Sequence, residues 1–170
     1  LIFTGRGNDK VRAVLLATAT GTTLDHLAAT PPYRVQRRIL SPSNAAAGIA
    51  AIVEDDDTFR QRVALSPESW SCAGPEGAYL YFGISASGDV LDIACYSCDD
   101  GVCDPADVQI VILAADNGGS VAGPDLITTV ATALNRREIR PIADRLTVLS
   151  ATPLPYTLDL TLQVRNGAST

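Results

Sequence analysis

Three cysteines lie close together in the second half of the chain, and thiols of this kind bind metals or cycle between thiol and disulfide. They form the pattern Cys95-x2-Cys98-x4-Cys103. Two thiolates two residues apart can hold one zinc ion, and a third can come from the loop that follows. A fourth ligand is harder to find, because the remaining soft donors, His26 and Cys72, are distant in sequence. We therefore favour inert thiols and predict no metal ligands, leaving zinc or a disulfide as open alternatives.

Other chemistry-bearing residues also lack the partners that a reaction needs. A redox role for Cys95 and Cys98 is disfavoured because the pair leads into Asp99-Asp100 instead of opening a helix, and negative neighbours raise a thiol pKa. His26 is the single histidine, and it lies beside Asp25 with no nucleophile signature nearby. We predict no catalytic residues and no enzyme activity.

Cofactor motifs are missing from the two segments that come nearest to them. The glycine-rich stretch at 117–123 precedes a helix but lacks the spacing of a dinucleotide or phosphate loop. The acidic stretch at 97–107 lacks the alternate-residue spacing and the terminal glutamate of a calcium-binding helical hand. We read both stretches as solvated loops and predict no cofactor.

Composition excludes several classes of function. The chain has 170 residues and a net charge of −6, and its 13 basic residues form no polybasic stripe, which argues against a nucleic acid partner. The longest apolar run, Ile110 to Ala115, is far shorter than the roughly 20 residues of a membrane helix. The chain contains no Met and begins with Leu, so we expect it to be part of a longer translated protein.

Two arginine clusters are the candidate contact surfaces. One lies in the connection after the first helices and the other follows the helix that ends near Leu134, where capping of the helix end is the simpler interpretation. An arginine patch that faces the acidic loops of a neighbouring subunit is the functional alternative. The six candidates are Arg34, Arg37, Arg38, Arg136, Arg137 and Arg140.

The elements that must position these residues begin with helices. The segment 12–29 predicts two short helices broken at Gly21, with Thr22 and Thr23 as caps of the second. A connection follows at 33–51. The acidic run at 54–57 then predicts the capped start of another helix.

That helix and the next one are predicted to pair as a hairpin. Phe59 and Val63 share one face of the first helix, whose Arg60 and Arg62 are expected to point outward. The second helix begins near Pro75 and ends by Gly88. We expect the hairpin interface to contain the four apolar residues Phe59, Val63, Tyr79 and Phe82.

Beyond Gly88 the apolar period changes to that of strands. Segments 90–96 and 108–113 predict two strands, 124–134 a helix and 146–149 a third strand. Leu126 is expected to cover a core of Ile110, Ile112 and Val148. Strict alternation from Tyr156 to Val164 predicts a further half-buried strand.

The fold class is therefore α+β. N-terminal helices and a helical hairpin precede a small β-β-α-β sheet domain with a further terminal strand. We predict four parts: an N-terminal helical segment and connection at 1–51, the hairpin at 52–88, the sheet domain at 89–152, and the start of another β-containing domain at 153–170.

Five segments, taken in order, resemble the baseplate J-like family of contractile phage tails. They read ATGTTLDHLA at 19–28, EDDDTFRQRV at 54–63, SPESWSCAGPEGAY at 66–79, DIACYS at 92–97 and RPIADRLTV at 140–148. Each segment alone is weak, but their order and spacing together are specific, and the likeness covers about residues 15–164. The cysteine-rich loop departs from the plainer loop that the family leads us to expect.

The resemblance implies a structural wedge protein of the tail baseplate, without an active site. Its implied partners are copies of itself and other baseplate proteins, with no nucleic acid, membrane or small-molecule substrate. Its implied location is the baseplate of a virion or of a phage-tail-like particle, after synthesis in the bacterial cytoplasm. One rival interpretation is a small metal or redox protein that uses Cys95, Cys98 and Cys103. Another is a sugar-binding domain, for which this chain offers little aromatic stacking surface because only 5% of its residues are Phe, Trp or Tyr.

Overall fold

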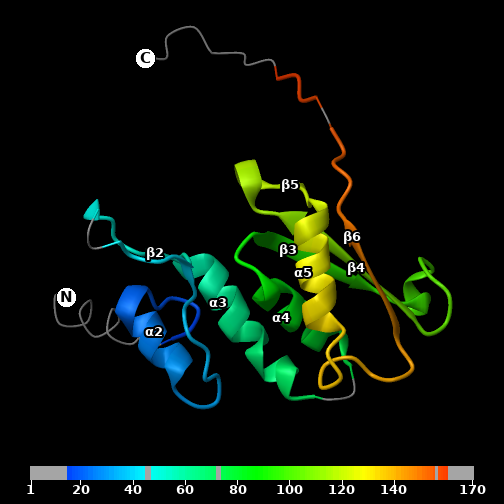
Figure 1. Cartoon of the computed structure of the whole chain (residues 1–170), viewed down its shortest axis with the longest axis horizontal. Coiled ribbons are helices and arrows are strands. Elements are labelled where there is room, and N and C mark those ends of the chain that lie inside the picture. Colours follow the sequence, from blue (N-terminus) through cyan, green and yellow to red (C-terminus); the bar gives the residue numbers. More distant parts are fainter. Residues whose placement is uncertain (1–14, 45–46, 72–73, 156, 161–170) are drawn as a thin grey trace, which may run out of the picture.

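The computed structural model describes residues 15–44, 47–71, 74–155 and 157–160. The described chain contains both helices and strands, in agreement with an α+β fold (Figure 1). The first half holds α2 (Gly21–Ala29), the short strands β1 (Ile39–Ser41) and β2 (Ile52–Val53), and α3 (Asp56–Leu65). The second half holds α4 (Glu76–Ala86), β3 (Val90–Tyr96), β4 (Asp107–Ala114), β5 (Ser120–Val121), α5 (Pro124–Leu134) and β6 (Arg145–Ser150).

Helix α3 begins where the acidic run predicted it. The Asp55 side chain caps the helix by accepting hydrogen bonds from the backbone N–H groups of Asp57 and Thr58, both at 3.0 Å. These bonds, first of all those from Thr58, hold the pKa of Asp55 below its usual value. Pro67 follows the helix in a 3-10 turn, η2 (Ser66–Trp70). The acidity of this segment therefore serves the helix start.

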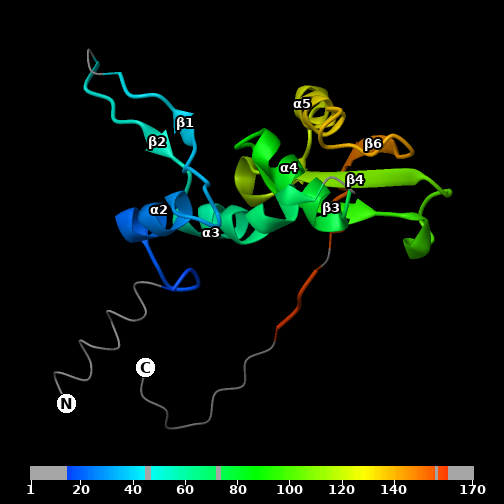
Figure 2. The same cartoon turned by 90° about the horizontal axis from the view of Figure 1, so that it is seen from below.

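The central strand of the main sheet is β4. It pairs antiparallel with β3 on one side and parallel with β6 on the other, and its last residues pair with β5. The parallel pairing of β4 and β6 requires a crossover connection, and α5 lies within it. Figure 2 shows α4 and α5 on one side of this sheet.

Two separate apolar clusters stabilise the fold. The larger lies between the sheet and helices α4 and α5, and includes Tyr79, Ile110, Ile112 and Val148, with Leu126 packed against it. The smaller joins α2 to α3 through Leu24, Ala28, Val35, Phe59 and Val63. The predicted common interface of Phe59 and Val63 with Tyr79 and Phe82 is therefore wrong. Helices α3 and α4 are neighbours, but each turns these side chains toward a different core.

Three further expectations are corrected. Arg62, expected to point outward, is buried, because Glu54 is buried beside it and accepts its hydrogen bonds. Arg60 is half-buried and donates to the backbone carbonyls of Leu16 and Ala19. Helix α2 begins at Gly21, so Thr20 occupies the cap position in place of Thr22 or Thr23.

The connection at 33–51 is also more structured than its composition indicated. It contains β1 and leads directly into β2, and these strands pair antiparallel, with Ile39 opposite Val53. Of the predicted terminal strand, residues 157–160 form no strand pairing and expose Leu158 and Leu160, because no described neighbour offers them a strand. Tyr156 and residues 161–164 lie outside the described residues. The division into four parts stays a prediction.

Candidate functional site

Arg37, one of the six predicted interface arginines, is used inside the protomer. Its guanidinium donates to Asp25 at 2.7 Å, to Asp56 at 2.6 Å and to the backbone carbonyl of Glu54 at 2.6 Å. It also lies 4.6 Å from the centre of the Phe59 ring, within range of a cation–π contact. Burial disfavours the charged form, but Asp25 and Asp56 outweigh it and raise the pKa of Arg37.

Arg38 and Arg62 form a second internal set around Glu54. Arg62 donates to both carboxylate oxygens of Glu54, at 3.0 and 2.6 Å, and Arg38 approaches the same carboxylate at 3.8 Å. Arg38 also donates to the carbonyls of Ile84 and Ser87 at the end of α4, both at 2.6 Å. A cation is favoured there because a helix exposes unpaired carbonyls at its C-terminus. Arg37 and Arg38 thus join the N-terminal elements to α3 and α4. The contact role of the six arginines stays a prediction.

The other four arginines have different surroundings. Arg34 and Arg137 are exposed, and Arg136 is exposed and pairs with Glu138. Arg140 is half-buried and donates to a backbone carbonyl in the turn after α5, while its buried Nε has no hydrogen-bond partner among the described residues. Of the six predicted arginines, Arg34, Arg136 and Arg137 are therefore the exposed ones.

The three clustered cysteines are distributed over one strand end and its loop. Cys95 is on β3, Cys98 is exposed in the 3-10 turn after it, and the Cys103 thiol lies 3.3 Å from the carbonyl of Asp107. All three are free thiols. Within the described residues, no group of three His, Cys, Asp or Glu side chains is placed to hold a metal ion. Cys72, the other thiol considered as a ligand, lies outside them.

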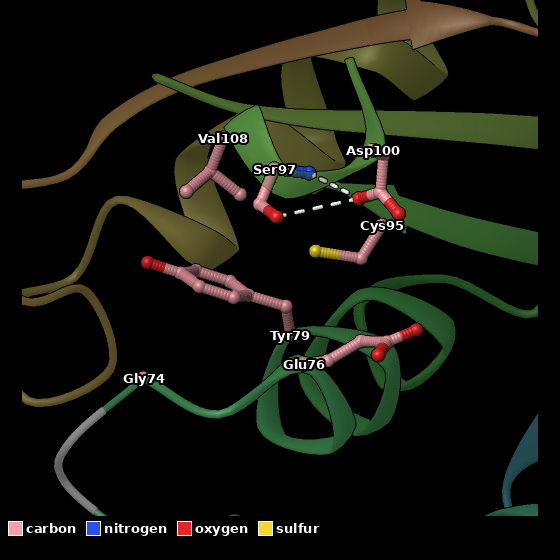
Figure 3. A pocket seen from close by; sticks show the side chains of 7 residues that line it. All are labelled: Gly74, Glu76, Tyr79, Cys95, Ser97, Asp100 and Val108. Carbon is pink, nitrogen blue, oxygen red and sulfur yellow. Dashed lines mark hydrogen bonds between the residues drawn. The ribbon is translucent and has the colours of Figure 1, made fainter. Parts of the chain in front are cut away.

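Cys95 lines a cavity of about 180 Å³ between the start of α4 and the end of β3 (Figure 3). Ser97 donates to the Asp100 carboxylate from its backbone N–H at 2.7 Å and from its hydroxyl at 3.3 Å. Ser97 thereby caps the 3-10 turn η3 (Cys98–Asp100). Burial first, and then Glu76, raise the pKa of Cys95 to about 11. A protonated thiol is a poor nucleophile, so Cys95 is unsuited to covalent catalysis near neutral pH.

Tyr79 is the other reactive side chain that lines this cavity. Its hydroxyl donates to Asp144 at 2.7 Å, and burial and Asp144 raise its pKa well above the usual value. The lining residues pair no base with a nucleophile. His26 is exposed on α2, beside Asp25, which already accepts from Arg37.

The thiols differ enough in their surroundings to predict an order of labelling. In the native protein near neutral pH, iodoacetamide is expected to modify exposed Cys98 at least tenfold faster than Cys95, because a group with a pKa of about 11 has little thiolate there. Peptide mass spectrometry after short labelling pulses measures both rates, and urea-unfolded protein is the control that should equalise them. Equal rates in the native state would contradict the burial of Cys95.

A two-stranded arm is a surface feature that sequence reasoning missed. Figure 2 shows β1 and β2 projecting away from the helices and the main sheet. Residues 39–53 contain no charged residue, which is the signal that marks the arm in the sequence. Its exposed apolar side chains are Ile39, Leu40, Ile49, Ile52 and Val53. An isolated two-stranded ribbon is marginally stable in water, and an apolar exposed one is typical of a contact surface.

Comparisons with known proteins show what this chain is similar to. The family model described as the Baseplate J-like N-terminal domain matches residues 1–44. The chain is 39% identical over 169 residues to Baseplate protein J of Escherichia phage P2, a match that covers 98% of this chain and 53% of that protein. The chain thus spans about half the length of the curated relative it matches. None of the described helices has both the length and the apolar character needed to cross a membrane.

Proposed function

This chain belongs to the baseplate J-like family, and we propose that it is a structural wedge component of a contractile phage tail baseplate or of a related phage-tail-like particle. The observation that carries the proposal is the 39% identity to a phage baseplate protein over 98% of this chain. The protein acts by assembly, with copies of itself and other baseplate proteins as partners. It resides in the tail baseplate and needs no nucleic acid, membrane or small-molecule substrate.

The surface of the chain supports an assembly role. The charge-free arm at 39–53 places five large apolar side chains in solvent, and such side chains are stabilised when a partner covers them. Arg34, Arg136 and Arg137 supply exposed cations, and arginine is enriched at interfaces.

Incorporation of arm variants into particles tests the proposal. Ile52→Asp is expected to lower incorporation at least tenfold without unfolding the chain, because Ile52 is 59% exposed and a buried aspartate would be uncompensated at an interface. Val121→Asp is the matched control, since Val121 is 57% exposed on the equally short β5.

The measurement uses the protein that contains this chain, mixed with the products of the neighbouring tail genes. Light scattering then gives the mass of the complexes, and electron microscopy shows whether they are baseplates. If wild-type protein stays monomeric in every mixture, or if both variants assemble as the wild type does, the proposed role of the arm is wrong.

A further inference from the structure

A surface hollow near the N-terminal elements has the composition of a protein-binding pocket. Its volume is about 270 Å³, and it is lined by Pro31, Pro32, Tyr33, Arg34 and Trp70. Trp70 is the single tryptophan of the chain and is 62% exposed. Tryptophan, tyrosine and arginine dominate the binding energy of protein interfaces, so an exposed cluster of all three is a candidate hot spot.

Arg34 gives this hollow a positive charge and a defined shape. Its backbone is in the left-handed region at φ 55°, and the prolines at 31 and 32 fix φ two residues earlier, so few conformations are open to the segment. Arg34 forms no ion pair with any described residue, in contrast to Arg37 and Arg38. The hollow therefore suits an acidic segment that also carries a small apolar side chain.

The β3–β4 loop at 97–107 has this complementary composition. Val102 is 51% exposed and lies between Asp99 and Asp104, which are exposed too. The loop is held in shape by the Ser97–Asp100 capping box and by Gly101, whose φ is 69°. A preordered loop loses little conformational entropy on binding.

The loop and the N-terminal elements lie at opposite ends of the long axis of the molecule, as Figure 1 shows for the β3–β4 loop and α2. The loop of one molecule is therefore positioned to reach another molecule. A contact that joins two different surfaces of identical chains repeats from copy to copy, and it closes into a ring when the rotation allows.

We propose that the β3–β4 loop of one copy docks into the Pro31–Arg34 and Trp70 hollow of the next copy. Val102 packs against Trp70, and Asp99 and Asp104 face Arg34. The contact joins copies head to tail. This inference rests on the proposed function, because it names the surfaces through which a baseplate component contacts itself.

Trp70 reports directly on the proposed contact. As concentration rises over a roughly hundredfold range at low ionic strength, the emission of Trp70 is expected to shift to shorter wavelength and to become protected from acrylamide, because Val102 covers the indole. Added salt should reverse both changes, since it screens the Arg34–Asp attraction. Sedimentation velocity on the same samples measures association. Association with unchanged Trp70 emission would overturn the inference.

Charge reversal gives the decisive test. Arg34→Glu and Asp99→Arg are each expected to weaken self-association at least tenfold, and the double variant Arg34→Glu/Asp99→Arg to regain most of it. Asp116→Arg is the matched control, because Asp116 is exposed in the β4–β5 turn and should not affect association. Loss in the double variant, or an equal loss with Asp116→Arg, would overturn the proposed contact.

The proposed function and this inference can fail separately. If wild-type and Arg34→Glu proteins enter baseplates equally well, the wedge role stands and the loop–hollow contact is wrong. If neither protein enters baseplates but charge reversal still controls self-association, the contact stands and the baseplate role is wrong.

Discussion

Replacing Glu54 with glutamine is expected to lower the free energy of unfolding by about 3–5 kcal/mol. The Glu54 side chain is 3% exposed, and its carboxylate accepts two hydrogen bonds from Arg62, which is also buried. A neutral amide would leave the Arg62 guanidinium without a counter-charge in a place that water does not reach. Urea denaturation monitored by circular dichroism measures the change.

Acid titration provides a second measurement of the same group. Burial works against the charged carboxylate, but hydrogen bonding and charge from Arg62, and then from Arg38, outweigh it and hold the pKa of Glu54 below 4.5. A carboxylate whose pKa is lower in the folded than in the unfolded state stabilises the fold at every pH above its unfolded-state pKa. This contribution is lost as the pH falls through its folded-state pKa. Wild-type stability should therefore fall more steeply below about pH 4.5 than that of Glu54→Gln.

Asp57→Asn is the control for this prediction. Asp57 also pairs with an arginine, Arg60, but its side chain is 93% exposed, and such a pair contributes about 1 kcal/mol at most. If Glu54→Gln lowers the free energy of unfolding no more than Asp57→Asn does, the buried Glu54–Arg62 ion pair does not hold the N-terminal elements against α3.

Replacing Phe59 with alanine is expected to cost about 3–5 kcal/mol, through lost burial and the cavity left behind. Phe59 is fully buried in the smaller apolar cluster, between residues of α2 and α3. Its ring also contacts the guanidinium groups of Arg37 at 4.6 Å and Arg62 at 5.5 Å. Phe59→Leu keeps most of the volume and should cost less than about 1.5 kcal/mol.

Hydrogen exchange locates the effect of Phe59→Ala. Because the two clusters are separate, amide protection should fall in α2 and α3 while β4 keeps its protection. Uniform loss of protection in both regions would show that the clusters unfold as one unit. Arg62 contacts both Phe59 and Glu54. The losses in unfolding free energy caused by Phe59→Ala and Glu54→Gln should therefore not add in the double variant.

Much of the local structure was predictable from the sequence. The acidic run at 54–57 predicted the start of α3, and the β-branched run at 108–113 predicted the strand that became β4. Gly123-Pro124 correctly predicted the start of α5. These signals suffice because capping, proline placement and apolar period act over a few residues. The resemblance to the baseplate J-like family was also visible in the sequence, since it depends on the order of residues along the chain.

The tertiary structure alone decided what each face meets. Arg62 is three residues after Phe59 and therefore shares its helix face. Its charge alone indicated an outward position, but the fold places the Glu54 carboxylate beside it and so allows it to be buried. Arg37 and Arg38 had the composition of a contact surface, and the carboxylates and helix end that engage them come from other elements. Trp70 and Arg34 line one hollow although they are 36 positions apart in the sequence. Burying a charge or forming a pocket needs partners brought together by long-range packing, and no local sequence pattern records where those partners will lie.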